Sequence, residues 1–447
     1  MEDFTAAVRE IVWGPVTLIL ILGTGILLSI KTGFAQIRFL PRAIRSFLGR
    51  KSSPEAKRSL FTALAATVGT GNIAGVAGAV AIGGPGAVFW IWICGMVGMV
   101  LKYAEAVLAV RYRRQHRGEW RGGPMYIICD GLGMRFRSLA FAYCVFGVVA
   151  SFGVGNAAQV NAVAVSLRGT MNAYGLPAGK SMDLLLGGVL GVLMGLTLLG
   201  GAGCIGKTAE KLVPAAALLY LAMSFGVLMC CRNRLPEAFR MIIQGAFDPK
   251  AVTGGMVGSA FQCMQTGISR GVFTNEAGMG TAAIAHGGSD VKHPVEQGLF
   301  GILEVFIDTI VICTLTALVI LCSAETVPYG VDTGAELTVR AFGSVYGNWA
   351  HGLLGAEIIL FAFTAMLGWG LYGGRCAQYL FGDKAWKPFV LCQSIAAMAA
   401  SVMDTEDVWT VSEIFNGMMA LPNLIALALL IPEVVRLTKD FSARKRI

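Results

Sequence analysis

The chain contains a series of apolar runs long enough to cross a lipid bilayer, and this feature restricts its fold more than any other. A helix crosses the hydrocarbon core of a bilayer with about 20 apolar residues. Strands of a membrane barrel alternate in polarity over about ten residues, whereas these runs are longer and apolar on all sides. The sequence therefore predicts an all-α integral membrane protein. The eleven predicted transmembrane helices cover about residues 11–30, 60–82, 84–110, 139–166, 183–203, 211–230, 251–286 (interrupted), 296–322, 350–372, 387–403 and 412–431.

The amino-acid composition argues against a soluble globular protein. Of all residues, 55% are hydrophobic and 14% are charged, whereas a soluble domain has roughly 25% charged residues. One soluble core would not bury so much apolar surface. We therefore expect the lipid bilayer to surround most of the chain.

The formal net charge of +9 is explained by the loops between the predicted helices. The loops on one side contain 26 of the 36 lysine and arginine residues, and those on the other side contain eight. Basic residues collect in cytoplasmic loops. We therefore expect the N-terminus outside, the C-terminus in the cytoplasm, and no nucleic-acid partner.

The distribution of cysteine and histidine gives no sign of a catalytic centre. The eleven cysteines show no metal-ligand spacing, most of them lie in apolar runs, and the four histidines are scattered. A membrane enzyme would need a cluster of nucleophile, base or metal ligands. We therefore expect no enzymatic activity and no cofactor.

The predicted helices divide the chain into two blocks of equal size. Residues 1–59 contain one extra N-terminal transmembrane helix and a basic cytoplasmic loop. Residues 60–230 and residues 251–431 contain five predicted helices each, and residues 432–447 form a basic cytoplasmic tail. Because five is an odd number, the second block enters the membrane from the opposite face, as an inverted repeat requires.

The first helix of each block is rich in glycine and hydroxyl residues at its middle. The first contains VGTGN at 68–72, and the second contains MQTGISRGVFTNEAGMG at 264–280. Unpaired backbone groups are costly in lipid, so an interrupted helix needs a compensating role. Discontinuous helices at matched positions of two inverted halves are typical of transport sites. We predict two discontinuous helices, with open backbone at 68–72 and near 266–271.

The residue types at the first interruption suit a polar solute and a hard cation. The candidates are Thr67, Gly69, Thr70, Gly71 and Asn72. The glycines let the backbone open, and the hydroxyl and amide side chains provide oxygen atoms. The N-terminus of a half-helix attracts a carboxylate, and freed carbonyl groups coordinate Na⁺. Because Gly71 and Gly75 are four residues apart, a packing face of small residues is the alternative.

Four other polar residues have more than one interpretation. Gln159 suits the wall of a binding site and, equally, an interhelical hydrogen bond. Ser269 is a candidate for the same wall. Arg270 and Glu276 flank the second interruption, and ionisable groups at this depth must pair or face water. A gating or structural role is favoured for Arg270.

Two pairs of ionisable residues lie inside predicted helices. Lys102 and Glu105 are three residues apart, and this spacing predicts a self-contained pair near the membrane interface. Glu304 and Asp308 are four residues apart and share a helix face. They would bind a cation or pair with Arg270.

Five stretches resemble the alanine/glycine:cation symporter family. They are VGTGNIAGVAGAVAIGGPGAVFWIW (68–92), KYAEAVLAVRYR (102–113), SRGVFTNEAGMGTAAIAH (269–286), FAFTAMLGW (361–369) and MALPNLIAL (419–427). The resemblance implies a leucine-transporter-type (LeuT-type) 5+5 inverted repeat with one extra N-terminal helix. It also implies that small neutral amino acids, alanine or glycine, enter the cell with Na⁺, occasionally with protons. The location it implies is a bacterial inner membrane.

The resemblance assigns roles to particular residues at the sodium site. Na⁺ and the substrate carboxylate would lie at the first interruption, with Thr67, Thr70 and Asn72 providing oxygen ligands. Thr364 would be a further sodium ligand beside the freed carbonyl groups. Ala365 stands where a second hydroxyl is expected, which affects the neighbouring contact.

The resemblance also assigns the substrate contacts. Gln159 and Trp369 would bound the binding site. The backbone around Gly267–Ser269 would contact the substrate amine. Na⁺ is the coupling ion in this interpretation, and no other cofactor is implied.

Two alternatives to a sodium-coupled carrier remain at this point. A channel would need a continuous pore, and two asymmetric interruptions within one chain fit a transporter better. Proton coupling would need a titratable group beside the site, and Glu276, Glu304 and Asp308 are candidates. The sequence distinguishes neither alanine from glycine or serine nor one oligomeric state from another.

Overall fold

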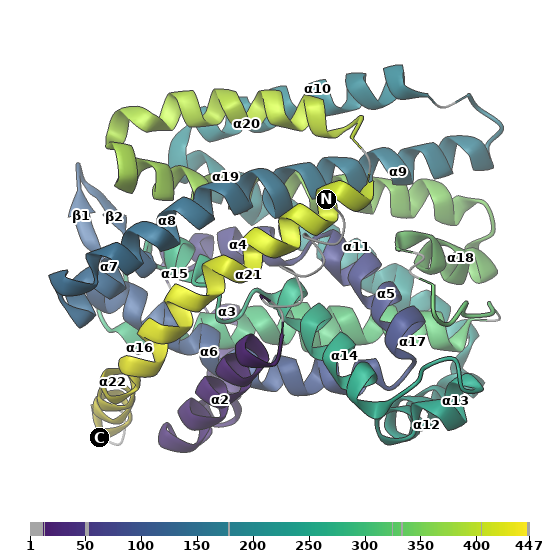
Figure 1. The fold of residues 1–447 in the computed structure, drawn as a ribbon, viewed down its shortest axis with the longest axis horizontal. Helices are drawn as coiled ribbons and strands as arrows, with labels where there is room; N and C mark the ends of the chain where they lie inside the picture. Colours follow the sequence, from purple (N-terminus) through teal and green to yellow (C-terminus); the bar gives the residue numbers. More distant parts are fainter. Residues whose placement is uncertain are drawn as a thin grey trace.

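The computed structural model describes residues 12, 14–49, 53–177, 179–323, 325–331, 334–403 and 405–444. The described part of the chain is mostly helical, as the sequence predicts. It contains one antiparallel hairpin of short strands, β1 (Arg114–His116) and β2 (Glu119–Arg121), in which Gln115 lies opposite Trp120. This hairpin projects from one end of the helical bundle (Figure 1).

The N-terminal half of the chain contains long helices with π-helical segments (η1, η2, η4) and 3₁₀ turns (η3, η5). The elements are α2 (Pro15–Lys31), α3 (Ala35–Leu48), α4 (Pro54–Thr67), η1 (Gly71–Gly75), α5 (Val76–Gly83), α6 (Ala87–Tyr112), α7 (Pro124–Tyr126), η2 (Ile127–Leu132), η3 (Met134–Phe136), α8 (Arg137–Phe152), η4 (Gly153–Ala157), α9 (Ala158–Ala173), α10 (Lys180–Leu199), α11 (Gly201–Cys230) and η5 (Arg232–Arg234).

The C-terminal half is built in the same way, with a π-helical segment η6 and a 3₁₀ turn η7. The elements are α12 (Leu235–Phe247), α13 (Pro249–Thr253), α14 (Ala260–Asn275), α15 (Thr281–His286), α16 (Pro294–Val305), η6 (Phe306–Cys313), α17 (Thr314–Cys322), α18 (Ala335–Tyr346), α19 (Trp349–Phe381), η7 (Asp383–Ala385), α20 (Trp386–Ala400), α21 (Thr405–Leu429) and α22 (Ile431–Arg444).

Every predicted apolar run contains helix in the described part of the chain. By length and composition, six helices are able to cross a membrane, or up to nine if each of three bent pairs is one span. The two remaining predicted runs contain α14 with α15, and α20. These helices are short, with 16 residues in α14 and 15 in α20.

Residues 31–59 contain more structure than the predicted basic loop. The helix α3 lies there, bent by 77° from α2. It has arginines on one side, whereas Ile37 and Leu48 are 54% and 75% exposed. An amphipathic helix of this kind suits the surface of a membrane.

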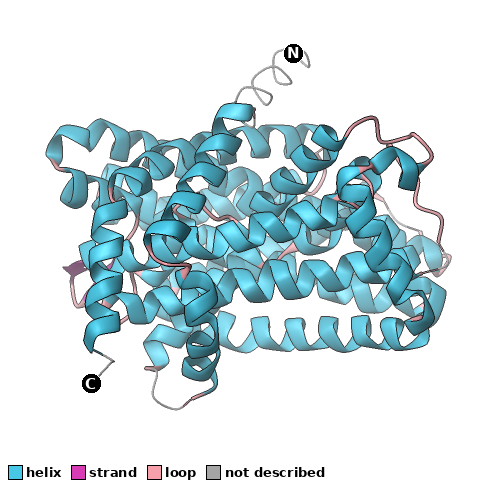
Figure 2. Cartoon of the chain, turned by 90° about the horizontal axis from the view of Figure 1, so that it is seen from below, coloured by secondary structure: helices cyan, strands magenta, loops and turns pink. Residues whose placement is uncertain are grey.

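The helix α6 is the most buried of the candidate spans, since 89% of its 18-residue apolar stretch is buried inside the protein. Glycines bring two neighbours close to it. A Cβ atom at Gly267 of α14 would lie 2.4 Å from the carbonyl oxygen of Ala87, and one at Gly301 of α16 would lie 2.6 Å from that of Lys102. Figure 2 shows the helices of the bundle running alongside one another. The close approach explains how α6 supports both α14 and α16.

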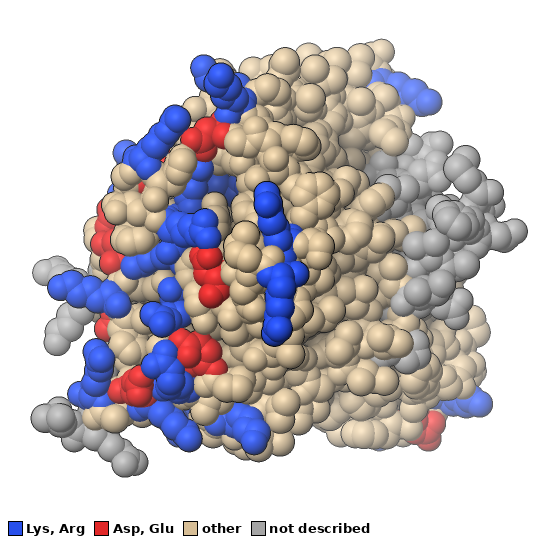
Figure 3. Space-filling view, turned by 60° about the vertical axis from the view of Figure 1, so that its left-hand side comes forward, with Lys and Arg blue, Asp and Glu red and all other residues tan. Residues whose placement is uncertain are grey.

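Basic side chains gather at one end of the molecule (Figure 3). The β1–β2 hairpin, α3 and α22 contribute to this end, and all three lie in segments predicted to be cytoplasmic. The rest of the visible surface carries few charges. The separation of charged and apolar surface is what a bilayer-spanning protein requires.

The contact between α6 and α12 gives a test of the packing. A Cβ atom at Gly86 would lie 2.1 Å from the backbone of Gly245, and backbone atoms move less readily than side chains. We expect Gly86→Ala to lower the free energy of unfolding by about 1–3 kcal/mol. Thermal unfolding of the detergent-solubilised protein measures this.

The matched control is Gly188→Ala on α10, where the nearest atom to a Cβ would be 3.8 Å away. We expect an unchanged or slightly higher melting temperature, because alanine is the better helix former. Equal melting temperatures for both variants would contradict the close contact at Gly86.

Candidate functional site

The first predicted interruption is present between α4 and η1. The helix α4 ends at Thr67, Val68 has extended backbone, and the two segments are bent by 51°. In a continuous helix the Gly69 amide would bind the Ala65 carbonyl. It instead donates to Oδ1 of Asn72 at 2.9 Å. The carbonyl of Ala65 is thereby released from the helical ladder.

The amide of Asn72 connects this interruption to η6. Its Nδ2 donates to Oδ1 of Asp308 at 2.7 Å and to the Asp308 carbonyl at 3.2 Å. Thr309 donates to the other carboxylate oxygen at 2.8 Å. The structure therefore uses Asn72 chiefly to hold the interruption, and Asp308 lies directly beside it.

Gln159 and α19 flank the first interruption, as the sequence predicts for the neighbourhood of the site. Oγ1 of Thr70 donates to Oε1 of Gln159 at 3.1 Å. A Cβ atom at Gly69 would lie 3.6 Å from Cβ of Ala365 and 3.7 Å from Oε1 of Gln159. The interhelical hydrogen bond, the alternative interpretation of Gln159, is therefore also present.

Thr67 and Thr364 are both buried and form similar bonds. Each hydroxyl donates to carbonyl oxygens of its own helix, at 3.2 Å from Thr67 to Ala63 and at 3.0 Å from Thr364 to Phe361. A hydroxyl has one hydrogen and two lone pairs. Both oxygens therefore keep lone pairs with which to bind a cation.

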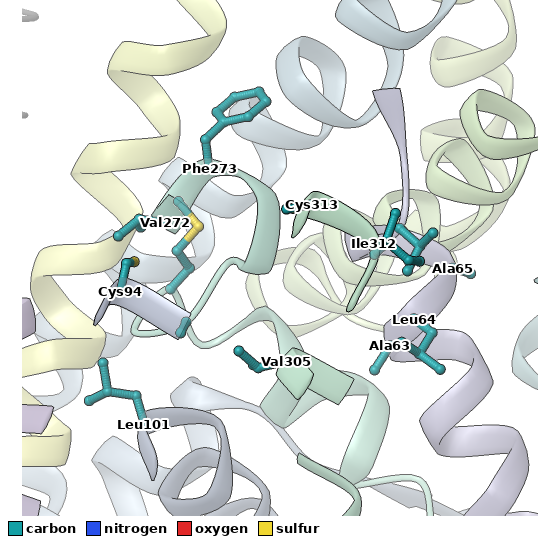
Figure 4. Packing of buried hydrophobic residues seen from close by; sticks show 14 of the residues in the cluster. Ala63, Leu64, Ala65, Cys94, Leu101, Val272, Phe273, Val305, Ile312 and Cys313 are labelled. Atoms are coloured by element: carbon teal, nitrogen blue, oxygen red, sulfur yellow. The ribbon is translucent and has the colours of Figure 1, made fainter. Parts of the chain in front are cut away.

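Gly71 and Gly75 both face α14. Cβ atoms at these positions would lie 3.3 and 3.8 Å from Cγ2 of Thr274. Ala63 of α4, Phe273 of α14 and Ile312 of η6 belong to the buried apolar cluster of the protein (Figure 4). The small-residue packing face therefore exists alongside the interruption.

The predicted position of the second interruption is wrong. The helix α14 runs without a break from Ala260 to Asn275, through Gly267 and Ser269. The interruption lies at 276–280, where Glu276 has a left-handed φ of 52°. Gly267 is a glycine because α14 packs closely on α6 at this position. A glycine in the sequence therefore did not mark the point where the helix is interrupted.

Glu276 at the second interruption is bound from two sides. Nε1 of Trp369 donates to Oε1 at 2.7 Å, and Thr281 donates to Oε2 at 2.7 Å. Trp369 is 1% exposed and packs against Gly155 of η4. The tryptophan predicted for the wall of the binding site therefore holds the carboxylate of the second interruption.

Glu105 satisfies another part of the second interruption. Its Oε1 accepts from the Gly280 amide at 3.0 Å and from Nδ2 of Asn423 at 2.8 Å. Asn423 also donates to the Gly278 carbonyl at 2.9 Å. This role was not predicted from the sequence, although a polar residue in an apolar run is the signal that points to such a role.

The predicted interfacial pair of Lys102 with Glu105 is wrong. Both side chains are fully buried, and Nζ of Lys102 lies 2.8 Å from Oε1 of Glu304. His286 contacts the other oxygen of Glu304 at 3.0 Å, and Gln297 lies 2.7 Å from His286. The spacing of three residues predicted a pair within one helix, but the close packing of α6 on α16 brings Lys102 to Glu304 instead.

Four carboxyl groups surround the two interruptions in the described part of the chain, and one lysine faces them. The carboxyl groups belong to Glu105, Glu276, Glu304 and Asp308. Burying charge without compensation is costly. Each of the four has at least one hydrogen-bond or ion-pair partner, as described above for Glu105, Glu276, Glu304 and Asp308.

Comparison with known proteins places these features in context. Residues 1–447 match the model of the sodium:alanine symporter family. An uncharacterized transporter of Haemophilus influenzae is 40% identical, covering 100% of this chain and 97% of the relative. The sodium/alanine symporter AgcS of Methanococcus maripaludis is 38% identical, covering 98% of both chains. The crystal structure of MhsT in complex with L-phenylalanine is similar with a TM-score of 0.58 at 13% identity, covering 87% of this chain and 99% of MhsT.

The bond between Trp369 and Glu276 yields a prediction. Trp369→Phe keeps an aromatic ring but leaves a buried carboxylate without one donor, which costs about 1–3 kcal/mol. We expect a lower melting temperature than for Trp92→Phe, whose Nε1 donates at 2.7 Å to the hydroxyl of Thr314. The hydroxyl can rotate to another partner. If both variants lower the melting temperature by the same amount, the hydrogen bond to Glu276 stabilises the protein no more than the bond to Thr314 does.

Proposed function

The chain belongs to the sodium:alanine symporter family, and we propose that it couples the inward movement of alanine or glycine to that of Na⁺. Its relatives and structural neighbours are transporters, so the chain is a multi-pass membrane transporter and not an enzyme. The proposed architecture is eleven helices, with a 5+5 inverted repeat, an external N-terminus and a cytoplasmic C-terminus.

The interruption between α4 and η1 is the observation that carries the proposal. It releases the Ala65 carbonyl beside Thr67 at the end of α4. Thr364 of α19 precedes Ala365, whose Cβ would lie 3.6 Å from a Cβ atom at Gly69. Neutral oxygens of this kind suit Na⁺. The N-terminal end of the η1–α5 half-helix attracts the carboxylate of a zwitterion.

The proposed coupling follows from this shared site. Na⁺ would compensate the carbonyl dipoles and hold the ends of the interrupted helix, so that the amino acid binds more tightly in its presence. The coupling free energy is equal for both ligands. In this proposal, alternating access would expose the shared site first to one side of the membrane and then to the other.

Proton coupling is the second candidate function. The four buried carboxyl groups around the interruptions support it, because a carboxyl group can bind and release a proton. Glu276 in particular contacts Trp369, which is proposed to bound the substrate. A proton would then take the place of Na⁺ as the driving ion.

Ion replacement separates the two candidates. With the protein in vesicles at fixed pH, we expect uptake of labelled alanine to fall at least about tenfold when choline replaces Na⁺. Uptake that persists in choline and follows the pH gradient would support proton coupling instead. Competition by glycine, serine and larger amino acids in the same assay defines the substrate class.

Thr364→Ala tests the proposed sodium ligand. We expect the Na⁺ concentration for half-maximal uptake to rise about tenfold, which corresponds to about 1.4 kcal/mol. Thr197→Ala is the control, because Oγ1 of Thr197 makes a similar bond within its helix, at 2.9 Å to the Leu193 carbonyl, on the exposed side of α10. Unchanged sodium dependence in Thr364→Ala would exclude Thr364 as a ligand.

A further inference from the structure

We propose that a basic cavity formed by the β1–β2 hairpin, the turn between α10 and α11, and the turn between α19 and α20 binds the phosphate group of an anionic phospholipid. This site is separate from the two interrupted helices. It lies at the end of the molecule where the basic side chains gather (Figures 1 and 3).

Two adjoining hollows form the site. One has a volume of about 210 Å³ and the other about 420 Å³, and both are lined by Arg121, Gln378 and Trp386. Small-molecule sites commonly have volumes of about 300–1,000 Å³. The second hollow alone falls within this range.

The charges that line the cavity are predominantly positive. The basic residues are Arg117, Arg121, Arg375, Lys384 and Lys387, and the acidic residues are Glu119 and Asp383. A hydrogen bond from Arg121 and a second one with His116 lower the pKa of Asp383 to about 2, so its carboxylate is charged at neutral pH. The five basic residues outnumber the two acidic ones by three, which favours an anionic ligand.

Arg121 lines both hollows. Its side chain is 12% exposed, and Nη1 binds Oδ1 of Asp383 at 2.8 Å. Its Nε is buried and has no hydrogen-bond partner among the described residues. Phosphate oxygens are preferred partners of arginine.

The surroundings favour a lipid over a soluble phosphate. Leu199 lines the smaller hollow and is 53% exposed, and Phe381 and Leu391, on either side of the α19–α20 turn, are 75% and 62% exposed. Trp386 donates from Nε1 to the Leu198 carbonyl at 3.1 Å, and tryptophan is common at membrane interfaces. Basic pockets between membrane helices on the cytoplasmic side bind anionic headgroups. The headgroup would occupy the cavity and the acyl chains would follow the apolar residues.

The double variant K384Q/K387Q tests the site in the intact protein. Neither lysine forms a hydrogen bond or ion pair among the described residues, so we expect the fold to be retained. Native mass spectrometry with added phosphatidylglycerol or phosphatidylcholine measures lipid binding. We expect the wild type to prefer phosphatidylglycerol, and the variant to bind it at least about tenfold more weakly, since each basic residue near a membrane surface contributes severalfold.

The matched control is K439Q/R444Q, which removes two exposed basic residues of α22 at the same end of the molecule. Its binding of phosphatidylglycerol should equal that of the wild type. Equal losses in both double variants would indicate general surface attraction and would overturn the proposal. So would unchanged binding in K384Q/K387Q.

Soluble ligands separate the two sources of phosphate. Inorganic phosphate and glycerol 3-phosphate at millimolar concentrations should not displace the lipid or raise the melting temperature. If they bind as tightly as phosphatidylglycerol, the site is one for soluble phosphates and the lipid assignment is wrong. None of these measurements depends on transport, so they test this site independently of the proposed function.

Discussion

Every backbone amide and carbonyl within a bilayer needs a hydrogen-bond partner, and the two interrupted helices meet this need with side chains. At the first interruption the side chain of Asn72 accepts a hydrogen bond from the Gly69 amide. At the second, the side chain of Asn275 accepts a hydrogen bond from the Ala277 amide, and that of Glu105 accepts one from the Gly280 amide. These side chains allow irregular backbone deep inside the protein, and the proposed site depends on that backbone.

The two interruptions are linked through one helix. Glu304 of α16 binds Lys102 and His286, close to the second interruption, while Asp308 binds Asn72 at the first. These two acids are four residues apart, about one helical turn. Movement of α16 and η6 would therefore affect both interruptions.

The helix α19 provides a second link between the interruptions. Gly368 allows it to approach Ala66 at the end of α4, and Trp369 binds Glu276. Residues one turn earlier, Thr364 and Ala365, lie beside the first interruption. The single helix α19 therefore contacts both interruptions.

The sequence by itself determined the helical membrane class and the interruption at 68–72, because apolar runs and glycine-rich segments are read along the chain. Only the tertiary structure decided that the second interruption lies at 276–280 and that Lys102 pairs with Glu304. At the second interruption, Glu105 binds Gly280, which is 175 residues away in the sequence, and Asn423, which is 318 residues away. Local patterns show that a polar group is buried, but the packing of distant helices determines which group compensates it.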